Sequence, residues 1–470
     1  MKSKLDKYLY TWPHEELNAQ SGWKKSQHKG FIEHPMPESE EKLANDSRWP
    51  GFFPSAICFV TTTNGKQTAL EKVVGATIVN RFPFIVALSF CTKPLSKRHY
   101  VREEFIKMLE EGRSVAVQYF EPGESIDKCM NAINTIDDNE IDKRIGSTGL
   151  KTIKAQTNDC KVFTDAYMVY EAKLVKPGKD FEGQKIFDKP YTDFGSHRIY
   201  YLEIEAIQLR EDICKGESQV HWRSLPFWDP KNELQPKVEG ISKPLMDVKY
   251  QKGYASDYMF PAKNTTAFYY DRIENGMCIK HLPPLPEDQV EVDNDKARWP
   301  CFFPSSVGMI TTYAEDGTPN LMPCGSTSIL IRHPLCIAIC VSYAKVNVRY
   351  APRASLDTLL KNKKFICGVP FVNETVIDGI KYSGNISSAQ DKHKISNAGL
   401  AFMNDDEGPV LNALPIHFKC KVVEIVRLGT HFLFLGQTES ILVREDVSIE
   451  NKLKWYSYPD VETAKAEVKI

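Results

Sequence analysis

Several motifs that would assign a chemistry at once are missing from this sequence. It has no Gly-x-Gly-x-x-Gly dinucleotide fingerprint, no phosphate-binding P-loop and no Gly-x-Ser-x-Gly nucleophile turn. The His-Glu-Glu-Leu that begins at His14 lacks the second histidine of a zinc protease, and no paired Cys-x-x-Cys or tight His/Cys cluster occurs. We therefore expect no metal site, and a separate NAD-binding domain or an α/β-hydrolase is disfavoured.

An excess of one charge and long apolar runs are also missing. The formal net charge of the 470-residue chain is -1, which argues against a nucleic-acid-binding surface over the whole protein. No run approaches the roughly 18 apolar residues of a membrane helix, and residues 1–17 lack the apolar segment of a secretory signal. The 12 cysteines are scattered, many of them in apolar runs, as expected of free thiols in a reducing compartment. These features predict a cytoplasmic protein that binds neither a membrane nor nucleic acid.

What the chain does have is a repeated segment. Arg48–Leu88 and Arg298–Cys340 both begin with Arg-Trp-Pro-x-Phe-Phe-Pro-Ser and continue through two β-branched runs. Within them Gly75-Ala76-Thr77 matches Gly325-Ser326-Thr327 in sequence. Since 470 residues are too many for one compact core and fit two domains of about 200 residues each, the pattern predicts a tandem duplication.

We divide the chain accordingly into four parts. Residues 1–33 form an arm rich in aromatic side chains, and residues 34–229 form repeat 1. Residues 230–280, with several prolines and an aromatic cluster, read as a linker that packs on the body. Residues 281–470 form repeat 2.

Each repeat shows the same order of predicted elements. In repeat 1 the expected strands are 57–63, 85–90, 114–119, 166–174 and 198–207, with an amphipathic helix at 101–112. In repeat 2 they are 307–312, 335–341, 365–369, 416–426 and 432–442, with a helix at 354–361. Many short strands around one helix predict a mainly β fold, a β-barrel with flanking helices in each repeat. Strand–helix alternation typical of a parallel sheet is not seen.

The candidate binding residues of repeat 2 are small or cationic. An Asp316-Gly317 turn leads into a segment with little bulk and several hydroxyl groups, which a flat or phosphorylated ligand can approach closely. That segment comprises Cys324, Gly325, Ser326, Thr327 and Ser328. Further candidates lie around the start of the predicted helix, namely Asn347, Arg349, Arg353 and Ser355. A hydroxyl-rich strand end beside a solvated basic face would explain the same residues without a ligand.

The order of these motifs in repeat 2 resembles the flavin reductase-like family of FMN-binding split barrels. The resemblance rests on Asp-Gly-Thr-Pro-Asn at 316–320, the segment 324–328, the proline-led strand after Arg332, and Gly429-Thr430-His431. It implies two tandem split barrels that form an internal pseudo-dimer, with FMN as cofactor and NAD(P)H as a possible co-substrate. It also implies that His431 lies near the flavin and the nicotinamide, although Thr430 stands where the family has an acid.

Repeat 1 departs further from that pattern. It has Asn64-Gly65 without the following Pro-Asn, and the charged pair Glu71-Lys72 precedes its candidate residues Gly75, Ala76 and Thr77. Repeat 1 either binds a second FMN or forms the other wall of a single site.

Three functions remain open at this point. The resemblance favours an FMN-dependent oxidoreductase that takes electrons from NAD(P)H or from a protein redox partner. A non-enzymatic FMN protein that transfers electrons is the second reading, and a structural or ligand-binding duplicate without flavin is the third. The electron acceptor, the number of flavins and further oligomerisation are not determined by the sequence.

Overall fold

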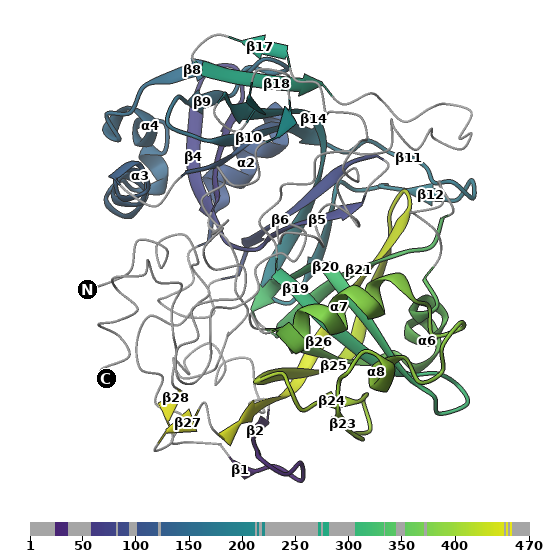
Figure 1. Cartoon of the computed structure of the whole chain (residues 1–470). Helices are drawn as coiled ribbons and strands as arrows, with labels where there is room; N and C mark the ends of the chain where they lie inside the picture. The colour runs from purple at the N-terminus through teal and green to yellow at the C-terminus, as the bar shows by residue number, and fades with distance from the viewer. Residues whose placement is uncertain are drawn as a thin grey trace.

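The computed structural model describes two β-barrels and the helices around them. The described residues are 24–35, 58–80, 83–93, 101–120, 124–211, 214–215, 219–220, 271–273, 276–281, 306–332, 334–344, 353–370, 374–445, 448–449 and 452–453. Figure 1 shows repeat 1, coloured purple to teal, above repeat 2, coloured green to yellow.

Six antiparallel strands close the barrel of repeat 2. They are β19 (Ser306–Tyr313), β20 (Pro319–Arg332), β21 (Leu335–Ser342), β22 (Lys364–Val369), β25 (Ile416–Arg427) and β26 (His431–Arg444). Their order is β26-β21-β20-β19-β22-β25, and β25 pairs with β26 to complete the ring. The 14-residue strand β20 takes part twice, since its first half pairs with β19 and its second half with β21. A closed ring leaves none of these six strands as an unpaired edge.

Repeat 1 is built in the same order and is also barrel-like. Its strands are β3 (Cys58–Thr63), β4 (Thr68–Val73), β5 (Ala76–Asn80), β6 (Ile85–Cys91), β7 (Ser114–Tyr119), β10 (Met168–Leu174) and β14 (His197–Arg210). Here β4 and β5 together correspond to β20, because β4 pairs with β3 and β5 pairs with β6.

Corresponding helices flank the two barrels. Repeat 1 has α2 (Glu103–Gly112), α3 (Glu124–Thr135), η1 (Asp138–Glu140) and α4 (Lys143–Ser147), and repeat 2 has α6 (Ser355–Asn362), α7 (Glu374–Asn385) and α8 (Lys394–Asn397). The apolar face of α2 is buried through Phe105, Ile106, Met108 and Leu109. Both α2 and α6 end at a left-handed residue, Arg113 and Lys363, whose N–H group bonds a leucine carbonyl four residues earlier.

The shorter strands form hairpins around these barrels. They are β1 (Lys24–Lys25), β2 (Phe31–Pro35), β8 (Thr152–Lys154), β9 (Lys161–Phe163), β11 (Gly178–Lys179), β12 (Lys185–Ile186), β13 (Tyr191–Phe194), β15 (Cys214–Lys215), β16 (Gln219–Val220), β17 (Asp271–Ile273), β18 (Met277–His281), β23 (Phe402–Met403), β24 (Val410–Leu411), β27 (Ser448–Ile449) and β28 (Lys452–Leu453).

The hairpin that precedes each repeat joins the last strand of the other repeat. Strand β2, which comes before repeat 1, pairs with β26 of repeat 2, and β18, which comes before repeat 2, pairs with β14 of repeat 1. Figure 1 shows the two hairpins at opposite ends of the molecule. This exchange ties the repeats together by backbone hydrogen bonds.

A second core lies between the two barrels. It contains apolar side chains from both repeats, including Val79, Ile85, Ala87 and Tyr201 of repeat 1 and Leu330, Ile331, Ala338 and Leu433 of repeat 2. Between β5 and β20 the approach is close. A Cβ atom placed on Gly75 would lie 3.3 Å from the carbonyl oxygen of Ile329, and the Ser89 hydroxyl donates to the carbonyl of Leu330. Gly75 therefore serves the packing of the two barrels.

The expected mainly β fold with flanking helices is confirmed. The strands expected at 114–119 and 365–369 agree with β7 and β22 to within one residue. Helices α3 and α7 were not expected, and the segment 324–328 proves to be the middle of strand β20. The domain boundaries stay a prediction, because most of 230–280 lies outside the described residues.

The strand register corrects the sequence alignment of the two repeats by one residue. Gly308 pairs with Cys324 in repeat 2, and Cys58 pairs with Val73 in repeat 1. Gly75, Ala76 and Thr77 therefore correspond to Ser326, Thr327 and Ser328, one position later than the sequence match suggested. The match on glycine was misleading because repeat 1 is one residue shorter between these strands.

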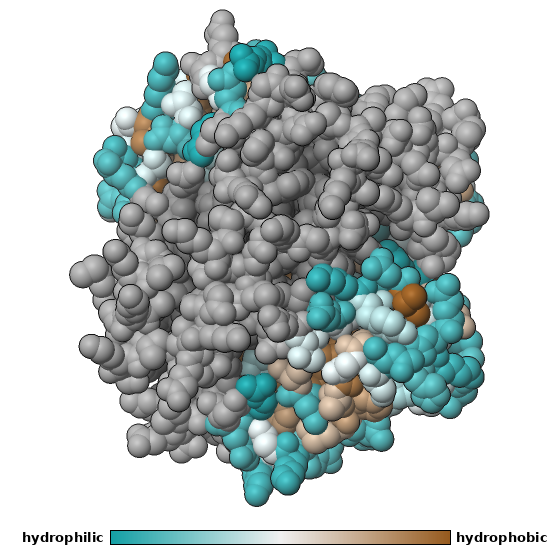
Figure 2. Space-filling view, viewed as in Figure 1, coloured by the Kyte–Doolittle hydropathy of each residue, from teal (hydrophilic) through white to brown (hydrophobic). Residues whose placement is uncertain are grey.

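The visible described surface differs between the repeats. In Figure 2 the described surface of repeat 1 is largely hydrophilic, whereas paler and brown residues gather on repeat 2 around α7 and α8. Among the described residues, no helix combines the length and the apolar composition needed to cross a bilayer.

A buried charge cluster fastens the first hairpin to repeat 2. His28 Nε2 lies 2.7 Å from Asp405 Oδ2, and Lys419 Nζ lies 3.0 Å from the same oxygen. Burial acts to raise the pKa of Asp405, but hydrogen bonding with Glu407, His28 and Lys419 outweighs burial and holds the pKa below its usual range.

We predict that Asp405→Asn lowers the free energy of unfolding at neutral pH by about 2 kcal/mol, because a charge-assisted cluster loses its carboxylate. A depressed carboxyl pKa stabilises the fold above the pKa of the unfolded chain, so this difference should shrink as the pH falls below about 4. Urea denaturation gives the energy, and amide hydrogen exchange of residues 31–35 reports the hairpin. The exposed neighbour Asp406→Asn is the control, and equal exchange in both variants would contradict the assignment.

Candidate functional site

The predicted site residues of repeat 2 gather where three neighbouring strands run side by side. Strand β21 lies between β20 and β26, and Ser342 at its end is paired with His431. The N–H group of Arg353 donates to the carbonyl of Ser342 over 3.2 Å. The pairing of Thr327 with Ile339 sets the small-residue segment beside the same end of β21. Arg353, His431 and the segment therefore share one end of the barrel, whereas Asn347 and Arg349 lie outside the described residues.

Within the small-residue segment the side chains divide into two groups. Thr327 Oγ1 donates to the carbonyl of Cys324 over 2.7 Å, and Cys324 Sγ lies 3.5 Å from the carbonyl oxygen of Cys340, so both face the protein. Gly325 and Ser326 are partly exposed. The Ser328 hydroxyl is buried and finds no hydrogen-bond partner among the described residues. Ser326 and Ser328 are thus the hydroxyls of this segment that remain for a ligand.

The corresponding position in repeat 1 repeats this feature. Thr77, which corresponds to Ser328, also carries a buried hydroxyl without a hydrogen-bond partner in the described part of the chain. Ala76 is buried beside it. A buried hydroxyl without a partner costs free energy, so two such groups at matching positions of neighbouring barrels are notable.

Helix α6 begins at a buried polar contact. The Ser355 side chain is buried at the first residue of α6, and Asn320 Nδ2 donates to its Oγ over 2.7 Å. Asn320 belongs to the Asp-Gly-Thr-Pro-Asn motif, so the motif positions the helix start that follows Arg353.

Sequence reasoning missed Lys394, which adds a second cation near Arg353. Helix α8 lies against β20, and the Lys394 side chain is only 5% exposed. Burial and the charge of Arg353 lower the pKa of Lys394 to about 8, while Asp391 opposes the shift. No ion pair joins Lys394 to a carboxylate in the part of the chain that the structure describes. The match of Arg-Ile-x-x-x-Gly-Leu at 144–150 to Lys-Ile-x-x-x-Gly-Leu at 394–400 could have indicated this residue.

A side chain from repeat 1 fixes the orientation of His431. Asn80 Oδ1 accepts hydrogen bonds from the N–H groups of Thr430 (2.7 Å) and His431 (3.1 Å) and from the Thr430 hydroxyl (2.9 Å). His431 Nδ1 lies 2.7 Å from the same hydroxyl oxygen. Because the hydroxyl has one proton and gives it to Asn80, Nδ1 must be the donor in the contact with His431. The Thr430 contact therefore fixes the orientation of the His431 ring.

An insertion of repeat 1 clamps the strand end next to this histidine. Repeat 1 carries residues 175–196 between its last two barrel strands, where repeat 2 has only a three-residue turn. The hydroxyl of Tyr343 donates to Asp180 Oδ2 over 2.6 Å, and Arg427 Nε donates to the same oxygen. Burial alone would raise the pKa of Asp180, but these hydrogen bonds outweigh it and lower the pKa.

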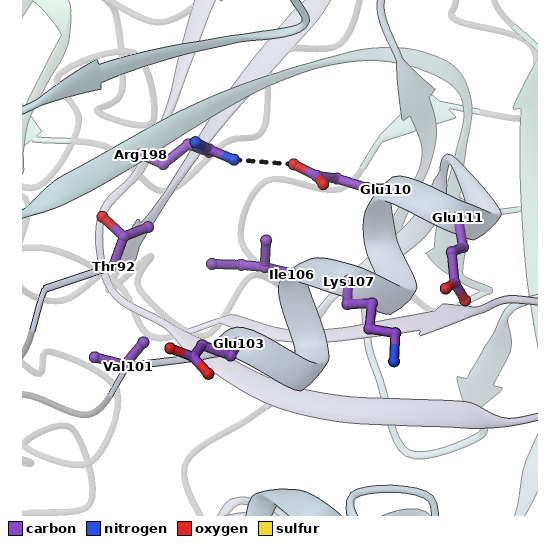
Figure 3. Close-up of a pocket in the computed structure, with 8 residues that line it drawn as sticks. All are labelled: Thr92, Val101, Glu103, Ile106, Lys107, Glu110, Glu111 and Arg198. Carbon is purple, nitrogen blue, oxygen red and sulfur yellow. Dashed lines mark hydrogen bonds and ion pairs between the residues drawn. The ribbon is translucent and has the colours of Figure 1, made fainter.

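Two of the open hollows formed by described residues lie away from residues 324–328 and His431. One of about 700 Å³ lies beside the first hairpin and includes His28, Tyr313 and Asp405. The other, of about 560 Å³, lies on repeat 1 beside α2. Figure 3 shows Glu103, Glu110 and Glu111 along that helix, with Arg198 paired to Glu110 at 3.0 Å.

Comparison with known proteins assigns the C-terminal part of the chain. Residues 300–459 match the Flavin reductase like domain. Repeat 2 contains a flavin reductase-like domain. The match covers every described site residue of repeat 2 and begins at the Arg-Trp-Pro motif.

Solved structures similar to this chain cover about a third of it. Flavoredoxin of Desulfovibrio vulgaris (Miyazaki F) is 19% identical over 34% of this chain and 78% of its own, with a TM-score of 0.27. Flavoredoxin from Methanosarcina acetivorans is 17% identical over 34% and 76%, with a TM-score of 0.27. Nitrilotriacetate monooxygenase component B from Bacillus cereus is 16% identical over 33% and 77%, with a TM-score of 0.29. No curated protein sequence matches the chain.

We predict that Asn80→Ile, which installs the residue found at the corresponding position 331, releases His431 from its single tautomer. Loss of an acceptor for three buried donors should lower the free energy of unfolding by about 2–3 kcal/mol. The ¹⁵N chemical shifts of the His431 ring check the tautomer, and urea denaturation checks the energy. Ile331→Val is the control at the matching position, and unchanged ring signals in Asn80→Ile would contradict the role given to Asn80.

Proposed function

We propose that the protein is an FMN-binding oxidoreductase of the flavin reductase type, in which repeat 2 holds the flavin. The observation that supports it most directly is the flavin reductase-like domain, whose predicted site residues meet at one end of the barrel. Electrons would come from NAD(P)H or from a protein redox partner.

The residues at this site have the chemistry that FMN requires. The partly exposed backbone of Gly325 and Ser326 and the unpartnered hydroxyl of Ser328 suit the edge of a flat ring with hydrogen-bonding atoms. Arg353 and Ser355 at the start of α6 suit a phosphate group. When bound, FMN would supply the hydride-accepting chemistry that protein side chains lack.

The protein's own contribution is positioning and proton handling. Asn80 and Thr430 fix the orientation of the His431 ring, which suits a group that takes up or gives a proton near a reacting centre. The clamp of Asp180 on Tyr343 and Arg427 supports the strand end that precedes Arg353. Both supports come from repeat 1, which agrees with the proposed internal pseudo-dimer.

Two further elements belong to this proposal. Ten cysteines in the part of the chain that the structure describes are free thiols, which supports the expected cytoplasmic location. A role as a non-enzymatic FMN electron carrier remains the second candidate, because no described residue distinguishes NAD(P)H from a protein donor.

The experiment that tests the proposal is a flavin titration followed by reduction. We expect the full-length protein to bind FMN, seen as quenched flavin fluorescence, and to lose its yellow absorbance when NADH or NADPH is added without oxygen. Reduction by dithionite or a redox protein alone would identify an electron carrier. A protein that binds no FMN would overturn the proposal in favour of a duplicate without flavin.

Bulk at Ser326 should exclude the flavin ring. We predict that Ser326→Phe abolishes FMN and riboflavin binding while the far-ultraviolet circular dichroism is unchanged, because the new side chain fills the space beside the small-residue segment. Ser147→Phe, at an exposed serine of repeat 1, is the control. Full flavin occupancy in Ser326→Phe would show that the ring lies elsewhere.

Removing the Arg353 guanidinium should weaken FMN but hardly affect riboflavin, which has no phosphate. We predict a loss of about 1.5–3 kcal/mol in FMN binding for Arg353→Ala, the cost of one charge-assisted pair. Lys361→Ala removes an exposed cation from the same helix and serves as the control. Equal FMN affinity for the two variants would refute Arg353 as a phosphate ligand.

A further inference from the structure

Repeat 1 holds a buried carboxylate between two arginines. Glu71 is fully buried, and its Oε2 accepts from Arg102 Nε and Arg144 Nη1, each at 3.0 Å. Its Oε1 accepts the N–H group of Lys72 at 2.8 Å. Two cations and a backbone donor around one pair of oxygens form a complete anion site, and here the anion belongs to the protein itself.

Both cations have counterparts in repeat 2. Arg144 and Lys394 each lie five residues before a left-handed glycine, Gly149 (φ +65°) and Gly399 (φ +74°). The helices that carry them lie against the corresponding strands β4 and β20.

Arg102 corresponds to Arg353 by its place in the backbone. Each donates its N–H group to the last residue of the corresponding strand, Arg102 to Cys91 over 3.4 Å and Arg353 to Ser342 over 3.2 Å. The cationic half of the site in repeat 1 is therefore present in repeat 2 as well.

The carboxylate has no counterpart. Glu71 pairs with Val60 across β3 and β4, and the corresponding pair in repeat 2 is Met322 with Ile310. Met322 is a buried apolar residue of the main core. Lys394 is consequently buried near Arg353 with no carboxylate ion pair of its own in the described part of the chain, an arrangement that an added anion would stabilise.

We propose that repeat 2 binds the phosphate of FMN between Lys394 and Arg353, and that the Glu71 carboxylate permanently occupies the corresponding place in repeat 1, so that the chain binds one FMN. This inference rests on the proposed function and adds the number of sites and the phosphate ligand Lys394.

The charged residues around α2 also disfavour the binding of a phosphate group by repeat 1. The hollow beside this helix is lined by three carboxylates, Glu103, Glu110 and Glu111, against the cations Lys107 and Arg198. Arg198 is already paired with Glu110 and with Asp193. Figure 3 shows this acidic lining, which would repel a dianion.

Exchanging the residue types at the matching positions 71 and 322 tests the inference in the full-length chain. Met322→Glu places a carboxylate beside Lys394 and Arg353, so FMN affinity should fall by about a hundredfold or more while riboflavin affinity stays within a few-fold. Inorganic phosphate should compete with FMN in the wild type and should have no effect on riboflavin binding to Met322→Glu. Met403→Glu, at a partly exposed methionine of repeat 2, is the matched control.

The opposite change addresses the number of sites. Wild-type protein should bind one FMN per chain, and Glu71→Met should add a second, phosphate-competed site. Because Glu71→Met removes the buried carboxylate that Arg102 and Arg144 share, Glu71→Gln is measured beside it, and phosphate should raise the midpoint of thermal unfolding of both variants more than that of the wild type.

The outcomes distinguish a failure of the proposed function from a failure of the phosphate assignment or of the role given to Glu71. Wild-type protein that binds neither FMN nor riboflavin overturns the proposed function. Flavin binding with unchanged FMN affinity in Met322→Glu, or an equal loss of FMN and riboflavin affinity, overturns the phosphate assignment. Two FMN per wild-type chain, or variants of Glu71 that gain no response to phosphate, overturn the role given to Glu71.

Discussion

The contact between strands β5 and β20 constrains the rest of this structure. Gly75 brings the backbone of one barrel against the carbonyl groups of Ile329 and Leu330 in the other, and Ser89 adds a hydrogen bond across the contact. A Cβ atom at position 75 would lie 3.0 Å from Ser89 Cβ and 3.3 Å from the carbonyl oxygen of Ile329, so these neighbours would have to shift. The core between the barrels, the support of His431 by Asn80 and the clamp of Asp180 all depend on this separation.

Because both barrels belong to one chain, the two sides of this contact have been able to diverge. Asn80 supports the Thr430-His431 pair of repeat 2, whereas the reciprocal position is Ile331, which offers nothing to Ser196-His197 of repeat 1. The insertion 175–196 reaches from repeat 1 to repeat 2 and has no equivalent in return. In a symmetric pair of identical chains each such change would alter both sites. Here both of these asymmetries support the histidine and strand end of repeat 2.

Much of the fold could be predicted from the sequence because it rests on local signals. Alternating β-branched runs located β7 and β22, and the amphipathic pattern of Phe105, Ile106 and Leu109 located α2. The small-residue segment was recognised by composition, but its position inside one continuous strand was not, since Gly325 and Ser326 have poor intrinsic preference for a strand. The pairing of β20 with both β19 and β21 overrides that preference.

The site was predicted only as far as its residues lie in recognisable motifs. Ser326, Arg353 and His431 stand in such motifs, and the structure brings them to one end of the barrel. Asn80 and Asp180 act across the contact between repeats, so no local pattern could assign them.

Glu71 shows why charge alone was a poor guide. In the sequence, Glu71 and the adjacent Lys72 are two charged residues that make repeat 1 depart from the flavin-binding pattern of repeat 2. In the structure the carboxylate is fully buried and satisfies Arg102 and Arg144. Burying a cation without an anion is costly, and Lys394 is buried with no carboxylate ion pair among the described residues. Repeat 1 supplies a carboxylate at this place. Repeat 2 has Met322 at the matching position, so an anion beside Lys394 would come from a ligand, and this single difference connects the duplication to the proposed number of ligands.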